Sequence, residues 1–282
     1  MKFLIIQENG RHKENRRFRE CFSLQKALIF LGQKCDTWGL GHDNFYSAID
    51  FNSYDVIINL ENYDISGWTP SLRGVRGYKI LWSIDAHCRG IKVYNNTFDS
   101  SNYDLMLQAT KDYVDHRSIW FPNCYDDTLI KPLKTRKEYN VGFCGNVVNR
   151  GKWLNEIDEK IGIKKDIFVI GDSMVRTINS YKVHINKNIA NDINYRSFET
   201  LGCGTVLATN YNSQYDELGF IDRNNCILYE NIGDLIKKIK NVLLNNELRF
   251  TIEKNGLELA KKHTYTTRAK KLLKIVKENI NT

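Results

Sequence analysis

The sequence predicts an α/β protein made of two Rossmann-like domains that face a cleft. Short apolar strands alternate with amphipathic helical stretches along its 282 residues, and such alternation is typical of parallel sheets with helices on both faces. The alternation is interrupted at 122–137, a stretch that holds two of the three prolines, and it restarts at Tyr139. We therefore expect domains at 1–121 and 138–282, joined by a hinge at 122–137.

The elements of the first domain follow from its apolar runs. Lys2–Ile6 is long enough for a buried strand but far too short to cross a membrane. Arg17–Leu31 carries its apolar residues at helical spacing, so we expect a helix there. Further strands are expected at Asp55–Leu60, Lys79–Trp82, Asp104–Leu107 and Ile119–Phe121.

The second domain repeats this pattern. Its first strand is expected at Tyr139–Cys144, and a helix follows from about Lys152. We also consider that the last helix of the chain packs back on the first domain. The remaining strands are expected at Ile167–Ile170, Lys182–Ile185, Thr205–Ala208 and Ile227–Tyr229, and the later helices at Asp234–Leu244 and Ala269–Glu278.

Composition narrows the class of protein. Hydrophobic residues make up 42% of the chain and aromatic residues 12%, which excludes a disordered protein. The seven cysteines are odd in number and scattered, with no Cys-x-x-Cys pair, so neither a disulfide framework nor a structural metal site is expected. With neither a membrane span nor a signal-peptide layout, the sequence predicts a reduced, cytoplasmic protein.

Basic residues outnumber acidic residues, and the net charge is +8. One cluster lies at Arg11–Arg19, where four arginines and a lysine accompany a lone Glu14. Because arginine forks onto phosphate oxygens better than lysine does, we predict that this cluster binds an acceptor or its phosphate. A second basic run, near the C-terminal end, is interpreted as a solvated helix face. The expected contacts of the first cluster are Arg11, His12, Arg16 and Arg17.

A candidate phosphate site lies in the segment Asn191–Thr209. A polar run is followed by a short helix that carries Arg196 and Glu199, then by a Gly-Cys-Gly break and an apolar strand. This order places a helix N-terminus, a guanidinium and a carboxylate on one rim of a sheet. Helix amides and a guanidinium suit a diphosphate, and a carboxylate suits ribose hydroxyls. The alternative is an ordinary surface pair between Glu199 and Arg196, three residues apart on a helix.

A second segment suited to phosphate begins the second domain. The strand that ends at Gly145 is followed by Asn146, Arg150 and a helix. Glycine lets a backbone approach a pyrophosphate closely, the helix end supplies amide donors, and Arg150 would neutralise charge on the leaving nucleotide. A plain strand-to-helix turn is the alternative. Asn188, in the loop before the Arg196 helix, could hydrogen-bond a base or a phosphate.

These segments resemble a known family. Arg196–Gly204 matches the pattern R-x-F-E-x-x-x-C-G of two-domain (GT-B) glycosyltransferases, especially the CgeB-like, family 1-like group, and His263–Arg268 is similar to its H-T-Y-x-x-R ending. Phe121–Pro132 resembles part of the hinge of such enzymes. Many members carry a second glutamate eight positions before the one that corresponds to Glu199. This chain has Asn191 at that position. The resemblance implies a nucleotide-sugar donor as co-substrate, UDP-sugar favoured, with no cofactor and no metal. It also implies donor contacts from Gly145, Asn146, Arg150, Asn188, Arg196, Phe198 and Glu199.

Acidic and imidazole side chains follow several strands of the first domain, where loops face the ligand in such folds. In a transfer that inverts the sugar, the acceptor hydroxyl needs a base. We predict Asp85 as that base and His87 as the second choice. Glu61 and His12 are further candidates. A structural role for each of them is the alternative.

The acceptor is the open part of the prediction. The arginine cluster favours an acceptor that bears phosphate, and the phage DNA-modifying members of the resembling group suggest double-stranded DNA with a hydroxymethylated base. The protein would then work in the cytoplasm of a bacterium or of a phage-infected host cell. An envelope glycan or a protein is the rival acceptor. A non-catalytic module that binds nucleotide sugars, supported by Asn191, and a pure nucleic-acid-binding protein are the rival functions.

Overall fold

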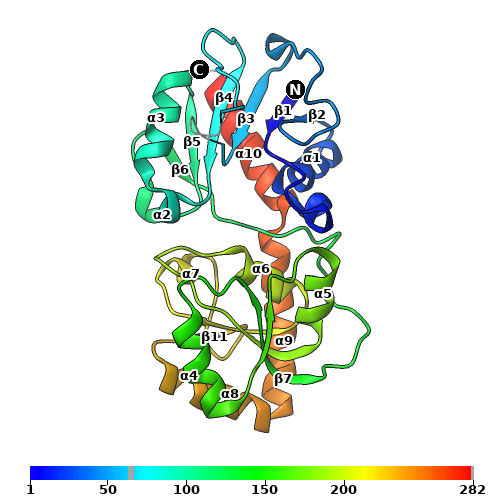
Figure 1. The fold of residues 1–282 in the computed structure, drawn as a ribbon, viewed down its shortest axis with the longest axis vertical. Coiled ribbons are helices and arrows are strands. Elements are labelled where there is room, and N and C mark those ends of the chain that lie inside the picture. The colour runs from blue at the N-terminus through cyan, green and yellow to red at the C-terminus, as the bar shows by residue number, and fades with distance from the viewer. Residues whose placement is uncertain (63–66, 281–282) are drawn as a thin grey trace. The chain divides into compact units, whose positions relative to one another are not determined.

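The computed structural model describes residues 1–62 and 67–280 (Figure 1). The chain forms two compact units. Met1–Pro122 and the last helix, α10 (Tyr265–Ile280), make the first unit, and Asn123–Thr264 makes the second. Within the described ranges, no helix is long and apolar enough to cross a membrane.

The first unit is built around a parallel six-stranded sheet. Its strands are β1 (Lys2–Ile6), β2 (Lys34–Trp38), β3 (Val56–Leu60), β4 (Tyr78–Ser83), β5 (Leu105–Gln108) and β6 (Ser118–Trp120). Its helices are η1 (Lys13–Phe18), α1 (Glu20–Phe30), η2 (Phe51–Ser53), α2 (Ala86–Arg89), α3 (Ile91–Ser101) and η4 (Lys111–Tyr113), and α10 packs beside α1 (Figure 1). The strand order is β2-β1-β3-β4-β5-β6, so the winding reverses between β1 and β3. Ligands of open α/β sheets bind at such a reversal, outside the carboxyl ends of the strands.

The second unit contains a parallel five-stranded sheet. Its strands are β7 (Tyr139–Gly145), β8 (Lys164–Ile167), β9 (Tyr181–Ile185), β10 (Val206–Asn210) and β11 (Ile227–Tyr229). Its helices are α4 (Gly151–Ile161), α5 (Gly171–Asn179), α6 (Tyr195–Gly202), α7 (Gln214–Glu217), α8 (Ile232–Leu244), α9 (Asn246–Ala260) and η5 (Lys261–His263). The order β11-β10-β9-β7-β8 reverses between β7 and β9. The prediction of an α/β protein with two Rossmann-like parallel sheets is therefore confirmed.

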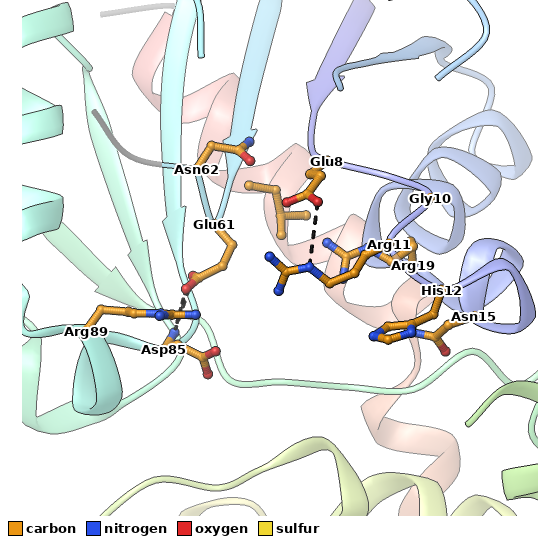
Figure 2. Close-up of a pocket in the computed structure, with 11 residues that line it drawn as sticks. Glu8, Gly10, Arg11, His12, Asn15, Arg19, Glu61, Asn62, Asp85 and Arg89 are labelled. Atoms are coloured by element: carbon orange, nitrogen blue, oxygen red, sulfur yellow. Dashed lines mark hydrogen bonds and ion pairs between the residues drawn. The ribbon is translucent and has the colours of Figure 1, made fainter. Parts of the chain in front are cut away.

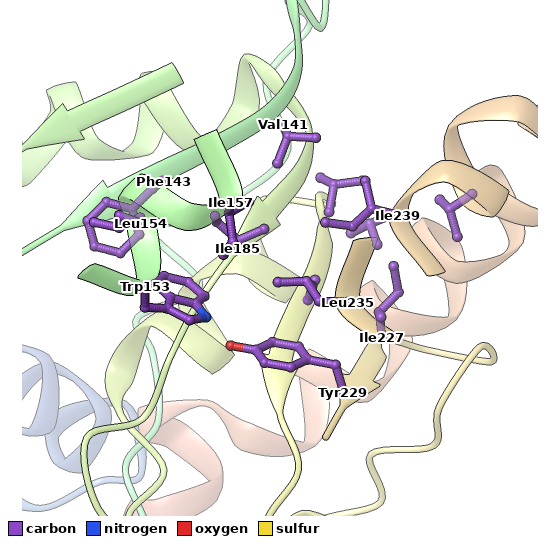
Figure 3. Close-up of a cluster of buried hydrophobic side chains, with 14 of the residues drawn as sticks. Val141, Phe143, Trp153, Leu154, Ile157, Ile185, Ile227, Tyr229, Leu235 and Ile239 are labelled. Carbon is purple, nitrogen blue, oxygen red and sulfur yellow. The ribbon is translucent and has the colours of Figure 1, made fainter. Parts of the chain in front are cut away.

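A hydrophobic core of the second unit joins the sheet to α4 and α8 (Figure 3). Trp153 of α4 stacks on Tyr229 of β11, with ring centroids 6.5 Å apart. The Tyr229 hydroxyl donates a hydrogen bond to the backbone oxygen of Asn186 at 2.9 Å. Because Asn186 directly follows β9, this core contact anchors a loop at the carboxyl end of the sheet.

One predicted strand is misplaced by three residues. The apolar run Ile167–Ile170 predicts a strand, whereas the structure places β8 at Lys164–Ile167. Phe168 adopts a left-handed backbone conformation with a φ of 57°, which ends the strand. β8 is an edge strand, and polar residues such as those it carries protect an exposed edge from further pairing. Apolar content alone therefore misled the sequence prediction.

The unit boundaries also differ from those expected. Residues 123–137, expected as a hinge, belong to the second unit. Tyr125 is buried against Gly202, where an added Cβ would lie 2.4 Å from the tyrosine ring. α10 groups with the first unit, which is the arrangement considered from the sequence for the last helix, and Arg268 Nε donates there to the backbone oxygen of Pro122 at 2.8 Å. Proline marks a loop in the sequence, but it does not show how firmly that loop packs.

Candidate active site

A cavity of about 270 Å³ lies in the first unit, at the carboxyl ends of its strands (Figure 2). Its lining comes from the loops after β1, β3 and β4, which meet where the winding of the sheet reverses. Figure 2 shows the groups from the β1 loop and those from the β3 and β4 loops on opposite sides of this cavity. The lining includes Glu8, Arg11, His12, Arg19, Glu61, Asp85 and Arg89.

Glu61 is a buried carboxyl group of the cavity with a shifted pKa. It follows β3 with a left-handed backbone, φ 58°, a conformation that costs free energy in a residue with a side chain. Its Oε2 accepts hydrogen bonds from the amides of Ile84 at 2.6 Å and Asp85 at 3.3 Å, and its Oε1 accepts one from the Tyr94 hydroxyl. Burial, and then the charge of Asp85, raise the pKa of Glu61 from 4.5 to about 7. This carboxyl group therefore exchanges a proton near neutral pH.

Asp85 lies beside Glu61 and lines the cavity. It occupies the position just before α2, and its backbone amide is held by Glu61. The structure thus brings the first-choice base, Asp85, together with the further candidates Glu61 and His12 around one cavity. His87 lies in α2, outside the lining of this cavity as the described residues define it. Among the predicted bases, the arrangement therefore favours Asp85 over His87.

The arginine cluster is only partly gathered at the cavity. Arg11 lines it with its Nε 4.0 Å from Glu8 Oε1. The guanidinium of Arg17 lies over the Phe18 ring, 5.6 Å from the centroid, and apart from the lining. The side chain of Arg16 lies outside the described part of the chain.

Two further arginines line the cavity: Arg19, which belongs to the predicted cluster but was not among its four expected contacts, and Arg89, which the sequence analysis missed. Each has a signal in the sequence. Arg19 closes the basic cluster that begins at Arg11. Arg89 follows Asp85 by four residues, which is one helical turn. The cavity therefore combines carboxylates with guanidinium groups, a lining suited to hydroxyl-rich and anionic ligands.

The second unit gathers three of its predicted residues at the reversal between β7 and β9. Gly145 ends β7, and Asn146 Oδ1 accepts a hydrogen bond from the Val148 amide at 2.9 Å. Arg150 donates from Nε to the backbone oxygen of Lys187 at 2.8 Å and from Nη1 to that of Asn146 at 3.2 Å. Arg150 therefore ties the loop after β7 to the loop after β9, and it holds a positive charge between them.

Arg196 and Glu199 lie on α6 near the same edge. Arg196 Nε donates to the backbone oxygen of Cys144 at 3.0 Å, and its Nη1 is paired with the Glu199 carboxylate. The two side chains keep 22% and 13% of their surfaces exposed, so both stay within reach of a ligand. Burial is the largest single influence and lowers the pKa of Arg196, but the charge and hydrogen bond of Glu199, together with the smaller influence of Cys144 and Cys203, leave the net pKa raised. The alternative weighed from the sequence, a pair three residues apart on a helix, is thus present in the structure.

Phe198 does not lie where a donor contact was predicted. Its side chain is fully buried, with its ring 5.2 Å from that of His263 and 5.9 Å from that of Phe220. This correction follows from helix geometry, because a residue between Arg196 and Glu199 points to another face of α6. The Phe198 side chain therefore packs α6 against the core.

Asn188 is likewise buried, and its groups are engaged within the protein. Its amide donates from Nδ2 to the Tyr215 hydroxyl at 2.8 Å, and its backbone N–H donates to Asn210 Oδ1 at 2.7 Å. A side chain committed to these partners shapes the loop after β9. We therefore interpret Asn188 as support for the site, in place of the direct donor contact expected from the sequence.

Comparison with known proteins gives the family. A family model described as glycosyl transferase-like matches residues 126–274, which is more than half of the chain. The chain belongs to the glycosyl transferase-like family. The matched region includes Arg150, Arg196 and Glu199. The resemblance stated from the sequence is therefore confirmed, and the protein is a glycosyltransferase.

Solved structures of glycosyltransferases share the whole fold. An alpha-glucosyltransferase in complex with UDP-glucose and DNA containing an abasic site matches with a TM-score of 0.72 and 10% identity, over 98% of this chain and 99% of that chain. Sucrose-phosphate synthase from Thermosynechococcus elongatus matches with a TM-score of 0.67 and 11% identity, over 99% of each chain. BGT of T4 phage, in complex with UDP and Mn²⁺, matches with a TM-score of 0.65 and 14% identity, over 98% of this chain and 99% of that chain. A comparison with curated protein sequences finds no match. Because the identities are only 10%, 11% and 14%, the likeness to these glycosyltransferases shows the fold of this chain, which is the GT-B fold.

Proposed function

We propose that the protein transfers a sugar from a nucleotide-diphosphate sugar, with a UDP-sugar favoured, to an acceptor hydroxyl. The observation that carries this proposal is the grouping of Arg150, Arg196 and Glu199 at the carboxyl ends of β7 and β9. Two guanidinium groups near a reversal of strand order suit a diphosphate, and a carboxylate that keeps a small exposed surface suits vicinal hydroxyls. Solved structures with the same fold contain UDP or UDP-glucose, which supports this choice of donor.

The donor would bind over the second sheet. Arg150 and Arg196 would stabilise the negative charge that develops on the departing diphosphate, which is electrostatic catalysis. Glu199 would accept hydrogen bonds from the ribose hydroxyls while it keeps Arg196 oriented. Because the chain itself supplies two positive charges, we propose that transfer needs neither a metal nor a cofactor. Turnover that stops in EDTA and returns with Mn²⁺ would contradict this part of the proposal.

The acceptor would bind in the cavity of the first unit. Asp85 would take the proton of the acceptor hydroxyl as the hydroxyl attacks the sugar, and Glu61 would orient the Asp85 loop through its amide bonds. The guanidinium groups of Arg11, Arg19 and Arg89 favour an acceptor that carries phosphate. A modified nucleic acid carries both a phosphate backbone for these charges and a hydroxyl that can accept the sugar.

We therefore propose a hydroxymethylated base in double-stranded DNA as the acceptor, and a cytoplasmic site of action. The net charge of +8 supports a polyanionic partner, and DNA accompanies the alpha-glucosyltransferase that shares the fold. A base in a duplex would have to be flipped out to reach a cavity of about 270 Å³. Transfer to an envelope glycan or to a protein, with no transfer to DNA, would replace this acceptor and leave the donor proposal intact.

Calorimetry with a panel of nucleotide sugars tests the donor proposal. We expect Glu199→Ala to weaken the binding of the UDP-sugar by about tenfold or more, because it removes charge-assisted hydrogen bonds. The matched control is Glu159→Ala, which removes an exposed carboxylate from α4 and should leave binding unchanged. Wild-type protein that binds none of the nucleotide sugars would refute the proposal. Binding without turnover on DNA, glycan or protein acceptors would instead indicate a non-catalytic nucleotide-sugar-binding module.

A further inference from the structure

A buried histidine connects three elements of the donor side. His184 lies on β9 and is buried. Its Nε2 accepts a hydrogen bond from the backbone N–H of Cys144, on β7, at 3.0 Å. Because Nε2 is an acceptor, the ring proton of a neutral imidazole lies on Nδ1. Nδ1 therefore donates to Thr200 Oγ1, on α6, at 2.6 Å.

The same hydrogen bonds continue to Arg196 and close on Cys144. The Thr200 hydroxyl donates to the backbone oxygen of Arg196 at 2.5 Å. Arg196 Nε in turn donates to the backbone oxygen of Cys144 at 3.0 Å, whose N–H began the path at His184. Four residues on β7, β9 and α6 thus form a closed ring of hydrogen bonds.

The charge state of His184 keeps the direction of these bonds constant. Burial, and then the positive charge of Arg196, lower the pKa of His184 from 6.5 to about 3. A protonated imidazole would have no acceptor for the Cys144 N–H. The neutral form is therefore the one that satisfies both neighbours, and it adds no second positive charge beside Arg196.

We propose that His184 and Thr200 are positioning residues, which hold Arg196 at the carboxyl end of β7 in the orientation that binds the donor diphosphate. The ring restrains Arg196 at two points, its backbone oxygen and its guanidinium. A long, flexible side chain that is held before the ligand arrives loses less conformational entropy on binding. This inference rests on the proposed function, because it holds that the ring of hydrogen bonds serves donor binding.

The Thr200 hydroxyl can be removed with almost no change of shape. Thr200→Val deletes both hydrogen bonds of that hydroxyl, and Thr200→Ser keeps them. We expect Thr200→Val to weaken UDP binding about threefold to tenfold, as the loss of one or two hydrogen bonds implies, and Thr200→Ser to restore the affinity to within about twofold. UDP affinity measured by calorimetry on the folded protein, with the melting temperature measured alongside, separates positioning from stability. A valine variant that melts earlier but binds UDP like the wild type would overturn the proposal.

The two nitrogens of His184 can be separated by a second pair of variants. The amide of His184→Gln can reach the Nε2 position and accept from Cys144, whereas that of His184→Asn can reach the Nδ1 position and donate to Thr200. We expect each variant to bind UDP more weakly than the wild type, because each keeps only one side of the ring.

A double variant tests most directly whether Thr200 acts on UDP binding through Arg196. In an Arg196→Ala background, Thr200→Val should cause no further loss of UDP affinity, because the group that it positions is already gone. Additive losses in the double variant would overturn the proposal. Wild-type protein that binds no UDP at all would instead refute the proposed function, so the two failures are distinguishable.

Discussion

Glu61→Gln tests whether the cavity of the first unit raises the free energy needed to ionise the Glu61 carboxyl group. Gln keeps the shape of the side chain, can still accept from the Ile84 amide, and can still bond to the Tyr94 hydroxyl. It removes only the titration. The variant therefore isolates the free energy needed to ionise Glu61 inside the folded protein.

The size of this effect on the free energy of unfolding follows from the burial of Glu61 beside Asp85. Burial and the charge of Asp85 raise the pKa of Glu61 from 4.5 to about 7, and each pH unit corresponds to about 1.4 kcal/mol. The folded protein holds this proton more tightly than the unfolded chain does. Ionisation of Glu61 therefore lowers the free energy of unfolding as the pH rises from 4.5 through 7, by about 3 kcal/mol in total.

Urea denaturation of the wild type and of Glu61→Gln across this pH range measures the effect. Near about pH 4 both side chains are neutral, and the two proteins should be equally stable. At about pH 8 the variant should be more stable by about 3 kcal/mol, and the difference should develop between the unfolded and folded pKa values. Taking the difference between the two proteins cancels the titration of all other groups. A constant difference across the range, or a variant that is less stable at high pH, would refute the reasoning.

Two further predictions concern packing and acceptor binding. Gly142→Ala should destabilise the protein by about 1–3 kcal/mol, because its Cβ would lie 2.3 Å from the buried Tyr181 ring. Gly151→Ala, where nothing lies within 4 Å of the added Cβ, is the control, and equal denaturation midpoints for the two would contradict the packing argument. Replacing the two exposed residues Arg11 and Arg17 with Gln should weaken the salt dependence of duplex DNA binding. The slope of log K against log salt, measured by gel shift, should fall in magnitude by about 2. An unchanged slope would mean that these arginines do not contact the phosphates.

Much of the architecture could be predicted because its causes are local in the sequence. Alternating apolar runs and amphipathic stretches indicated the two parallel sheets, and parallel strands bring their carboxyl ends to one edge. The sequence also indicated that a strand ends at Gly145 and that Arg150 follows shortly before a helix. The role of these two residues in binding the donor stays a prediction.

Other features depend on contacts between distant parts of the chain. The direction in which Phe198 points is decided by the phase of α6 against the core, and the R-x-F-E motif does not show it. The bond between Cys144 and His184 joins residues forty positions apart. The raised pKa of Glu61 arises from burial and from the loop after β4. None of these features leaves a local pattern in the sequence.

By itself, the sequence determined the fold class, the family and the segments whose chemistry suits a diphosphate. These depend on hydrophobic period, glycine positions and short motifs, which act over a few residues. Only the tertiary structure decided which side chains of those segments reach the surface. It packed Phe198 into the core, grouped α10 with the first unit, and closed the hydrogen-bond ring around Arg196. The physical reason is that burial, proton affinity and hydrogen-bond direction belong to the surroundings of a side chain, and folding alone assembles those surroundings.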